Sequence, residues 1–139
     1  MSALAKALVA MLLLGTLVAG IPVLAYVVVL GMIEGRPTPV HAGAGPALSC
    51  RNQIVKRMRV VDVFRVRESE TGRVTLAPGH EEATWVARRH LSKLPQTGML
   101  RWHFQSAALH VWIVQHWTPQ QITETARRGG ACRAPRGLR

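Results

Sequence analysis

Histidine is the first residue type to test for chemistry, because the chain carries six of them. His103 and His110 are seven residues apart in a run that predicts a helix, so they share one face, while His116 points elsewhere. A zinc site needs three or four convergent His, Cys, Asp or Glu ligands, and no carboxylate or cysteine completes this set. We therefore predict no metal site and no cofactor, and interpret these histidines as residues at the edge of a small core.

The carboxylates on predicted helices are Glu81, Glu82 and Glu124. A pair of carboxylates could serve glycosyl chemistry as a general base and a charge stabiliser. Acids in the first turn of a helix also suit the helix dipole, which accounts for Glu81 and Glu82 without any chemistry. The chain has no Gly-x-Ser-x-Gly nucleophile motif, and Gly129-Gly130 is too short to cradle phosphates. We predict no catalytic residue.

Basic side chains are the strongest chemical signal in the sequence. The formal net charge is +11, and Lys6 is the only charged residue before Glu34, so +10 of that charge follows. A basic domain beside a membrane favours anionic partners such as lipid headgroups, phosphate-bearing lipid carriers, anionic glycans or nucleic acid. An Arg-rich composition without any ligand is the alternative. The residues that we predict to bind an anion flank the two central helices: Arg88, Arg89, Lys93 and Arg101.

Four tryptophans are spread through the predicted helices, at positions 85, 102, 112 and 117. Tryptophan side chains can stack on sugars or on nucleic-acid bases. In a small domain they more often supply core contacts or contacts at a membrane interface. The tryptophans alone therefore do not select a ligand.

Residues 7–33 form a long apolar segment that precedes the part of the chain holding these side chains. The stretch holds no charged residue and is long enough as a helix to cross a bilayer, whose hydrocarbon core is about 30 Å thick. A cleaved signal peptide is the alternative, but its apolar core is usually only about 7–15 residues long. We predict a transmembrane helix over 7–33, kinked near Pro22, with residues 1–6 on the cytoplasmic side.

The rest of the chain divides into three parts. A Pro- and Gly-rich linker over 34–49 precedes a small soluble domain over 50–132, and a basic tail over 133–139 follows. Cys50 and Cys132 bracket the domain, which predicts a disulfide in an oxidising compartment, with two unrelated buried thiols as the alternative. The predicted fold class is mainly α, with a possible β-hairpin in an α+β domain.

The predicted hairpin lies in residues 53–76, where two Val- and Arg-rich runs surround a turn that contains glycine. The first run could instead continue a helix from Asn52. Three helices are expected after it, over about 80–94, 99–117 and 119–129. Thr118 as N-cap with Pro119 and Gln121 predicts the start of the last helix.

The helix over 99–117 is the longest one expected in the domain. Leu100, Phe104, Ala107, Val111 and Val114 share one side of it, and Trp102, Leu109 and Ile113 share another. A helix that is apolar on two flanks is expected to be buried on both. We therefore predict that this helix is the centre of the domain.

One stretch, residues 79–124, resembles the middle of the peptidoglycan glycosyltransferase domain of family 51, found in monofunctional transglycosylases and penicillin-binding proteins. Val86-Ala87-Arg88 is similar to the Leu-Ala-Arg that ends that family's Gly-Gly-Ser-Thr-x-Thr-Gln-Gln motif, and Gly79 falls near the motif's second glycine. Thr118-Pro119-Gln120-Gln121-Ile122 is similar to the family's Trp/Tyr-Ser-Lys-x-x-Ile-Leu. The family's Glu-Asp-x-x-Phe-x-x-His-Gly, which carries its catalytic Glu, has no counterpart.

The resemblance implies a single-pass inner-membrane protein of bacterial type, with its domain on the periplasmic side. The implied role is a degenerate, transglycosylase-like glycan-binding or accessory protein of the cell envelope. Its partners would be membrane lipid, lipid-linked glycan or peptidoglycan enzymes, and we do not expect nucleic acid. The alternative function is a non-enzymatic structural subunit of a membrane protein complex. A third possibility is a domain that faces the cytoplasm and binds nucleic acid or anionic lipid, which requires reduced thiols.

Overall fold

The computed structural model describes residues 3–41, 43, 45–64, 67–68, 74–95 and 98–132 of the chain. The chain forms two compact units, Met1–Glu34 and Gly35–Arg139, which are described here one at a time. The predicted tail over 133–139 lies outside the described residues. The architecture is mainly helical.

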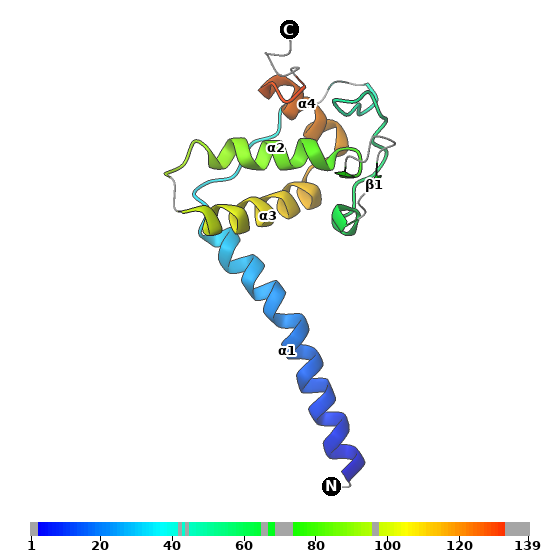
Figure 1. The fold of residues 1–139 in the computed structure, drawn as a ribbon, viewed down its shortest axis with the longest axis vertical. Helices are drawn as coiled ribbons and strands as arrows, with labels where there is room; N and C mark the ends of the chain where they lie inside the picture. Colours follow the sequence, from blue (N-terminus) through cyan, green and yellow to red (C-terminus); the bar gives the residue numbers. More distant parts are fainter. Residues whose placement is uncertain are drawn as a thin grey trace. The chain divides into compact units, whose positions relative to one another are not determined.

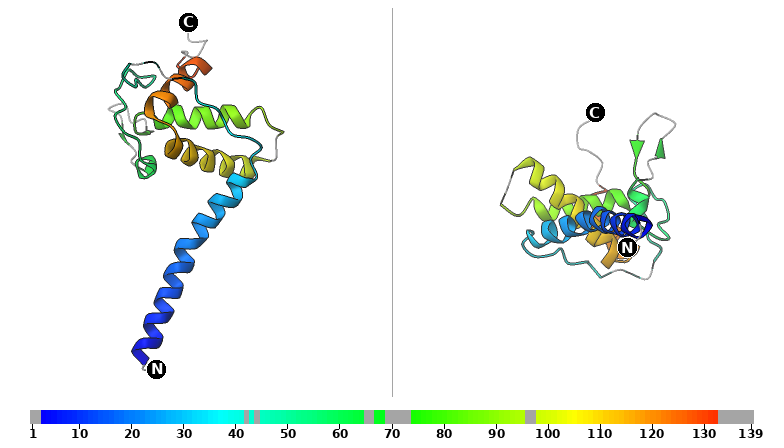
Figure 2. Two further views of the ribbon diagram at one scale, coloured as in Figure 1. Left: turned by 180° about the vertical axis from the view of Figure 1, so that it is seen from behind. Right: turned by 90° about the horizontal axis from the view of Figure 1, so that it is seen from below.

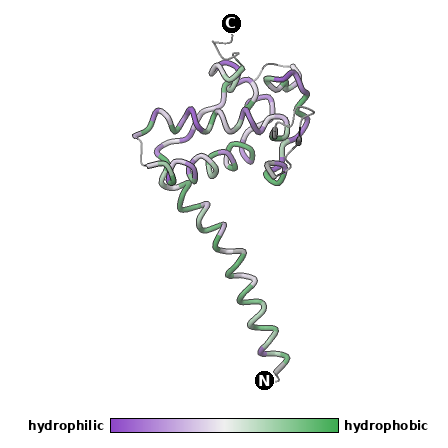
Figure 3. The backbone as a smooth tube through the Cα atoms, in the orientation of Figure 1, coloured by the Kyte–Doolittle hydropathy of each residue, from purple (hydrophilic) through white to green (hydrophobic). Residues whose placement is uncertain are grey.

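The first unit is helix α1, Ala3–Gly31, with Pro22 inside it. Figure 3 shows hydrophobic residues along almost its whole length. Its large apolar side chains are exposed on every side, which is typical of a helix whose solvent is lipid. Residues Leu4–Gly31 have the length and composition of a membrane span, although a signal sequence near the N-terminus has the same properties. The chain is therefore compatible with a single-pass membrane protein.

The second unit is built on helices α2 (His80–Leu91), α3 (Met99–His116) and α4 (Pro119–Gly129). Helices α2 and α3 run side by side, and α4 packs across α2 (Figures 1 and 2). Contact between α3 and α4 is much smaller. The central helix is therefore α2, and the prediction that residues 99–117 form the centre is wrong.

The core lies where these three helices meet. Ala83 and Ala87 of α2 are completely buried, and their small side chains allow the neighbouring helices to approach closely. The large side chains facing them are also completely buried: Leu109 and Ile113 from α3, and Ile122 from α4. Burial of each such aliphatic side chain stabilises the fold by about 1.5–3 kcal/mol relative to exposure.

One flank of α3 is not buried as predicted. Leu100 and Phe104 are 71% and 58% exposed, whereas Val114, further along the same stripe, is only 8% exposed. The buried arc of α3 is the other one, which holds Ala108, Leu109 and Ile113. Helical periodicity identified an apolar stripe correctly, but the core reaches only the C-terminal end of that stripe.

The start of α4 confirms the predicted capping. The Thr118 hydroxyl accepts a hydrogen bond from the Gln121 backbone N–H at 3.2 Å, and the Gln121 side chain accepts from the Thr118 N–H at 2.8 Å. Pro119 occupies the first turn, where its missing N–H costs nothing. Gly130 ends the helix in the left-handed conformation, with φ of 98°.

The long hairpin predicted in residues 53–76 is not supported. Val60–Phe64 is a 3-10 helix, here η1, and not a strand. Antiparallel pairing is limited to β1 (Arg67–Glu68) and β2 (Val74–Thr75), with two residues on each side. Residues 69–73, where the turn was expected, lie outside the described residues. Pairing this short adds little stability of its own.

The segment predicted as a linker contacts the domain. The Val40 N–H donates a 3.0 Å hydrogen bond to the Thr125 hydroxyl of α4, and Ala47 and Ser49 are buried. An isolated β-bridge then joins Leu48 to Ile54 and closes a tight loop. Part of the Pro- and Gly-rich stretch therefore belongs to the folded unit and is not only a spacer.

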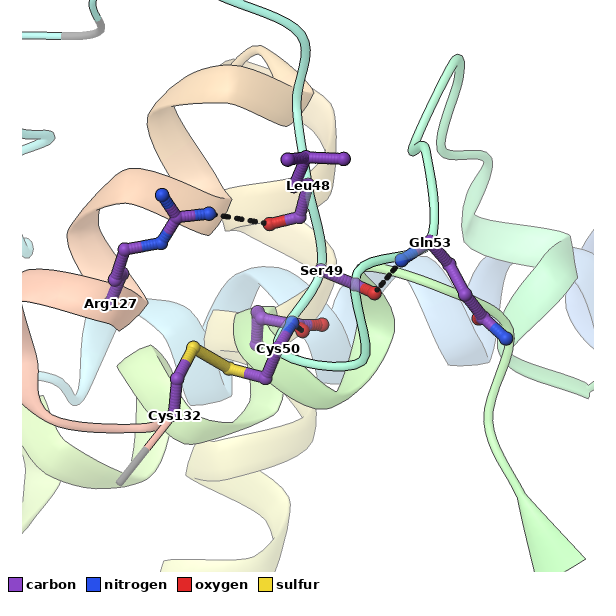
Figure 4. The surroundings of a disulfide bond; sticks show 7 residues. Leu48, Ser49, Cys50, Gln53, Arg127 and Cys132 are labelled. Carbon is purple, nitrogen blue, oxygen red and sulfur yellow. Dashed lines mark hydrogen bonds between the residues drawn. A yellow bond between two sulfur atoms is a disulfide. The ribbon is translucent and has the colours of Figure 1, made fainter. Parts of the chain in front are cut away.

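The predicted disulfide between Cys50 and Cys132 is present (Figure 4). Cys50 sits in the loop closed by the Leu48–Ile54 bridge, and its N–H donates to the carboxylate of Glu82 at 2.6 Å. Arg127 of α4 donates to the Leu48 carbonyl at 3.3 Å. Together these contacts fix the start of the domain to α2, to α4 and to the end of the described chain.

Candidate anion-binding cleft

A cleft of about 360 Å³ lies where the segment after α1 crosses α2 and α4. We call it the basic cleft. Three stretches of chain line it: residues 36–40, the second half of α2 with Lys93 beyond its end, and the last turn of α4. Its lining residues are Arg36, Pro37, Thr38, Val40, Trp85, Val86, Arg89, His90, Lys93, Thr125, Arg128 and Gly129.

The lining of the basic cleft is cationic. Arg36, Arg89, Lys93 and Arg128 contribute four positive charges, and no Asp or Glu is among the described residues that line the cleft. Glu124 lies one turn away and pairs with Arg128 at 2.7 Å, so it offsets part of one charge. The cleft therefore keeps a net positive potential, which attracts anions.

Arginine–tryptophan contacts hold two of these cations in place. The guanidinium carbon of Arg89 lies 5.1 Å from the centre of the Trp85 ring, and that of Arg36 lies 5.8 Å from the Trp112 ring. Cation–π attraction of this kind restricts a long side chain before any ligand arrives. A binding site that is ordered in advance loses less entropy when it binds.

The structure brings together only two of the four residues predicted to bind an anion. Arg89 and Lys93 line the basic cleft. Arg88 lies over the Trp102 ring of α3 at 5.5 Å, and Arg101 is an exposed residue in the first turn of α3. Arg88 and Arg89 are therefore neighbours in sequence, but Arg88 contacts α3 whereas Arg89 lines the cleft.

Arg36 and Arg128 also line the cleft, although neither was among the residues predicted to bind an anion. Arg128 follows Arg127 at the end of a predicted helix, and this basic pair is the one local pattern that could have suggested a cation at this place. Arg36 stands in a stretch that reads as a flexible spacer, and it enters the cleft because that stretch folds back. The hydrogen bond between Val40 and Thr125 joins residues 85 positions apart, which no local pattern reveals.

The buried histidines form a second polar cluster, away from the basic cleft. Nδ1 of His80 lies 3.1 Å from Nε2 of His110, and the Thr84 hydroxyl lies 2.9 Å from Nδ1 of His110. Burial, together with the smaller effect of the neighbouring His80, lowers the pKa of His110 to about 4. Burial also lowers the pKa of His80, although Asp62 and Glu82 partly oppose this.

His103 and His110 were predicted to share one face of a helix at the edge of the core, but the two residues differ in burial. His110 is 5% exposed and lies inside the core, whereas His103 is exposed near the free end of α3. His116 stacks on Trp112 and contacts its carbonyl oxygen. Within the described parts of the chain no three His, Cys, Asp or Glu side chains converge, so we assign no metal site.

The three glutamates considered for glycosyl chemistry are engaged elsewhere. Glu81 pairs with Arg51 at 3.0 Å, Glu124 pairs with Arg128, and buried Glu82 accepts the Cys50 N–H. None of the three lines the basic cleft. The arrangement of this cleft therefore suits binding of an anion and offers no carboxylate for acid–base catalysis.

Comparisons with known proteins leave the function open. No family model, no curated protein and no solved structure matches this chain. Of the residues that carry the resemblance to the family 51 glycosyltransferases, Val86, Ala87 and Ile122 are buried in the helical core. Because no comparison tests it, the resemblance stays a hypothesis. The function is instead argued from the basic cleft.

Proposed function

We propose that this protein is a membrane-anchored binding protein whose basic cleft holds the phosphate-bearing headgroup of a lipid-linked glycan. The observation that carries the proposal is the cleft itself, with four cations and no carboxylate among its lining residues. Arginine forms bidentate hydrogen bonds with phosphate oxygens, and lysine supplies a point charge. These groups match a diphosphate better than they match a neutral sugar alone.

The remaining lining residues suit the sugar next to the phosphates. Thr38 and Thr125 contribute hydroxyl groups, which can form hydrogen bonds with the hydroxyl groups of a sugar, and Val40 contributes apolar area for the sugar ring. A phosphorylated saccharide would therefore find a partner for each of its parts.

The chain keeps this cleft near a membrane. Arg36 is five residues after the end of α1, and an extended chain spans at most about 3.5 Å per residue, or roughly 18 Å here. When the lipid tail of a ligand lies in the same bilayer, its headgroup is confined to the thin layer of water next to the membrane, where the cleft also lies. Confinement raises its effective concentration at the cleft, so modest affinity suffices.

The proposed role is that of an accessory protein in cell-envelope or peptidoglycan metabolism and not of an enzyme. A glycosyltransferase needs an acid–base group near the reacting sugar, and the basic cleft has no carboxylate. We propose an extracytoplasmic, periplasmic location, which the Cys50–Cys132 disulfide supports because such bonds persist in oxidising compartments. The resemblance of residues 79–124 supports the same setting.

Binding of the full chain in nanodiscs to a polyprenyl-diphosphate-linked disaccharide tests the proposal. Replacing both Arg89 and Lys93 by glutamine should raise Kd by about tenfold, since charge-assisted hydrogen bonds to phosphate are lost. The matched control is Arg88→Gln with Arg101→Gln, which removes the same charge outside the cleft and should leave Kd within about twofold.

Two outcomes would overturn this function. An equal loss in both double variants would show that general positive charge, and not the cleft, attracts the ligand. Absence of binding by the unaltered protein would remove the ligand altogether and favour a structural subunit of a membrane complex. Measurement at two salt concentrations separates the first outcome from specific binding, because general attraction weakens most with salt.

A further inference from the structure

The first two turns of α3 carry a group of large apolar side chains that the described part of the chain leaves uncovered. Met99 is 80% exposed, Leu100 is 71% exposed and Phe104 is 58% exposed. We call these three residues the α3 patch. At helical spacing Leu100 and Phe104 lie one turn apart on the same side, and Met99 borders them. The apolar area is therefore contiguous, unlike the scattered exposed apolar residues of an ordinary surface.

The residues beside the α3 patch are basic and aromatic. Arg101 and His103 are exposed on the same two turns, and the rings of Trp102 and His103 are in contact at a nearly perpendicular angle. Helix α3 contains no Asp or Glu. The surface therefore combines insertable apolar side chains with positive charge, and it has no negative charge on its own helix.

This combination matches the interface of an anionic bilayer. Interfacial helices place apolar side chains at the boundary between headgroups and acyl chains while Arg or Lys contacts anionic lipid. Tryptophan is enriched at the same depth. The chain also carries its own apolar helix, Leu4–Gly31, with the length of a membrane span. When that helix spans a bilayer, the domain is tethered beside the same bilayer.

We propose that the α3 patch docks on the bilayer that α1 spans, with Met99, Leu100 and Phe104 inserted among the lipids and Arg101 on anionic headgroups. Docking would fix the orientation of the domain on the membrane in addition to its tether. The inference does not depend on the basic cleft, because the α3 patch and the cleft share no residue. It is distinct from binding of any glycan.

Photo-crosslinking in proteoliposomes tests the docking. A benzophenone amino acid would replace Phe104 in the full chain, reconstituted in vesicles of phosphatidylcholine with phosphatidylglycerol. The matched control carries the same group at Ile54, which is 61% exposed and lies outside α3. We expect lipid adducts at position 104 and few at position 54.

Two further variants sharpen the test. Arg101→Gln should lower the lipid adduct at position 104 by up to about fivefold in anionic vesicles, and much less in pure phosphatidylcholine. Arg89→Gln with Lys93→Gln should leave the adduct unchanged, so failure of the cleft and failure of the docking are distinguishable.

Three outcomes would contradict the docking. Lipid adducts of equal yield at positions 104 and 54 would indicate random collision with the bilayer. Absence of any lipid adduct at position 104 would show that the α3 patch does not contact the bilayer. Adducts to a second copy of this chain or to another added protein would identify a protein interface and overturn the lipid assignment.

Discussion

At the scale of single residues, the buried His80–His110 contact makes the stability of the domain depend on pH, because burial lowers the pKa of both rings. Both rings are almost completely buried, and Nε2 of His80 has no hydrogen-bond partner among the residues that the structure describes. Asp62 and Glu82 act on His80 and favour its charged form, while His110 faces His80 and Thr84. A proton on either ring would place a charge where burial opposes it.

The domain should lose stability as the pH falls below about 6.5. The folded pKa of His110 is about 4, below its unfolded value of 6.5, so the folded state binds the proton less well. Stability is therefore full above the unfolded pKa and decreases as the pH falls toward the folded pKa. Between pH 7.5 and pH 5 the free energy of unfolding should decrease by about 2 kcal/mol from His110 alone.

Urea unfolding followed by circular dichroism in mild detergent measures this loss. His110→Gln should remove most of the pH dependence in that window, whatever its effect at pH 7.5. Exposed His103 provides the control, and His103→Gln should keep the dependence of the unaltered protein. The same slope in His110→Gln would assign the titration to another group.

At the scale of elements, the packing of α2 on α4 depends on one glycine. A Cβ atom at Gly129 would clash with the indole ring of Trp85. Trp85 also lies under the guanidinium of Arg89, so the glycine, the indole and the cation form one stack beside the basic cleft. A side chain at position 129 therefore changes both stability and the shape of the cleft.

Gly129→Ala should destabilise the domain by about 1–3 kcal/mol, because overpacking forces the helices or the indole to shift. In a Trp85→Ala background the clash is absent, and the same change should be neutral or stabilise by about 0.5 kcal/mol through helix propensity. Thermal unfolding of the four proteins in this double-mutant cycle gives the coupling. Additive effects would show that Trp85 and Gly129 are not in contact.

Local signals predicted the helices well. Thr118, Pro119 and Gln121 are a complete start signal for α4, since their hydrogen bonds join residues three apart. Acids at Glu81 and Glu82 likewise marked the start of α2. The prediction of a long hairpin was wrong because β-branched residues such as Val60 and Val61 suit a strand only when a partner strand is available. Here they lie in the 3-10 helix η1.

Features that depend on distant residues were not predictable from local pattern. Periodicity placed Leu100 and Phe104 on an apolar face, but it does not show whether another element covers that face. Arg36 is part of a stretch with the composition of a spacer, and only its long-range contacts place it over Trp112 and in the cleft. The structure therefore places two of the four predicted residues, Arg89 and Lys93, in the cleft, and the other cations of the cleft come from elsewhere in the chain.

At the scale of the whole molecule, an apolar helix and a strongly basic domain are joined in one short chain. The domain is small, so its hydrophobic core is modest, and a cross-link between its ends has a large effect. The Cys50–Cys132 bond spans 82 positions and ties the segment after α1 to the chain just beyond α4. Its redox state therefore reports both on the stability of the domain and on the compartment that contains it.

Cys50 and Cys132 should resist alkylation in native membranes until a reductant is added. Loss of the cross-link frees a long loop in the unfolded chain, so reduction should lower the free energy of unfolding by up to roughly 4–5 kcal/mol. Gel mobility after maleimide treatment, with and without reduction, measures the thiol state, and urea unfolding measures the stability. A Cys50→Ser, Cys132→Ser variant is the control, because reductant should leave its stability unchanged. Two thiols that react at once in native membranes would contradict the periplasmic assignment. They would also weaken the lipid-linked glycan proposal, since a cytoplasmic +10 domain would meet nucleic acid and the inner leaflet instead.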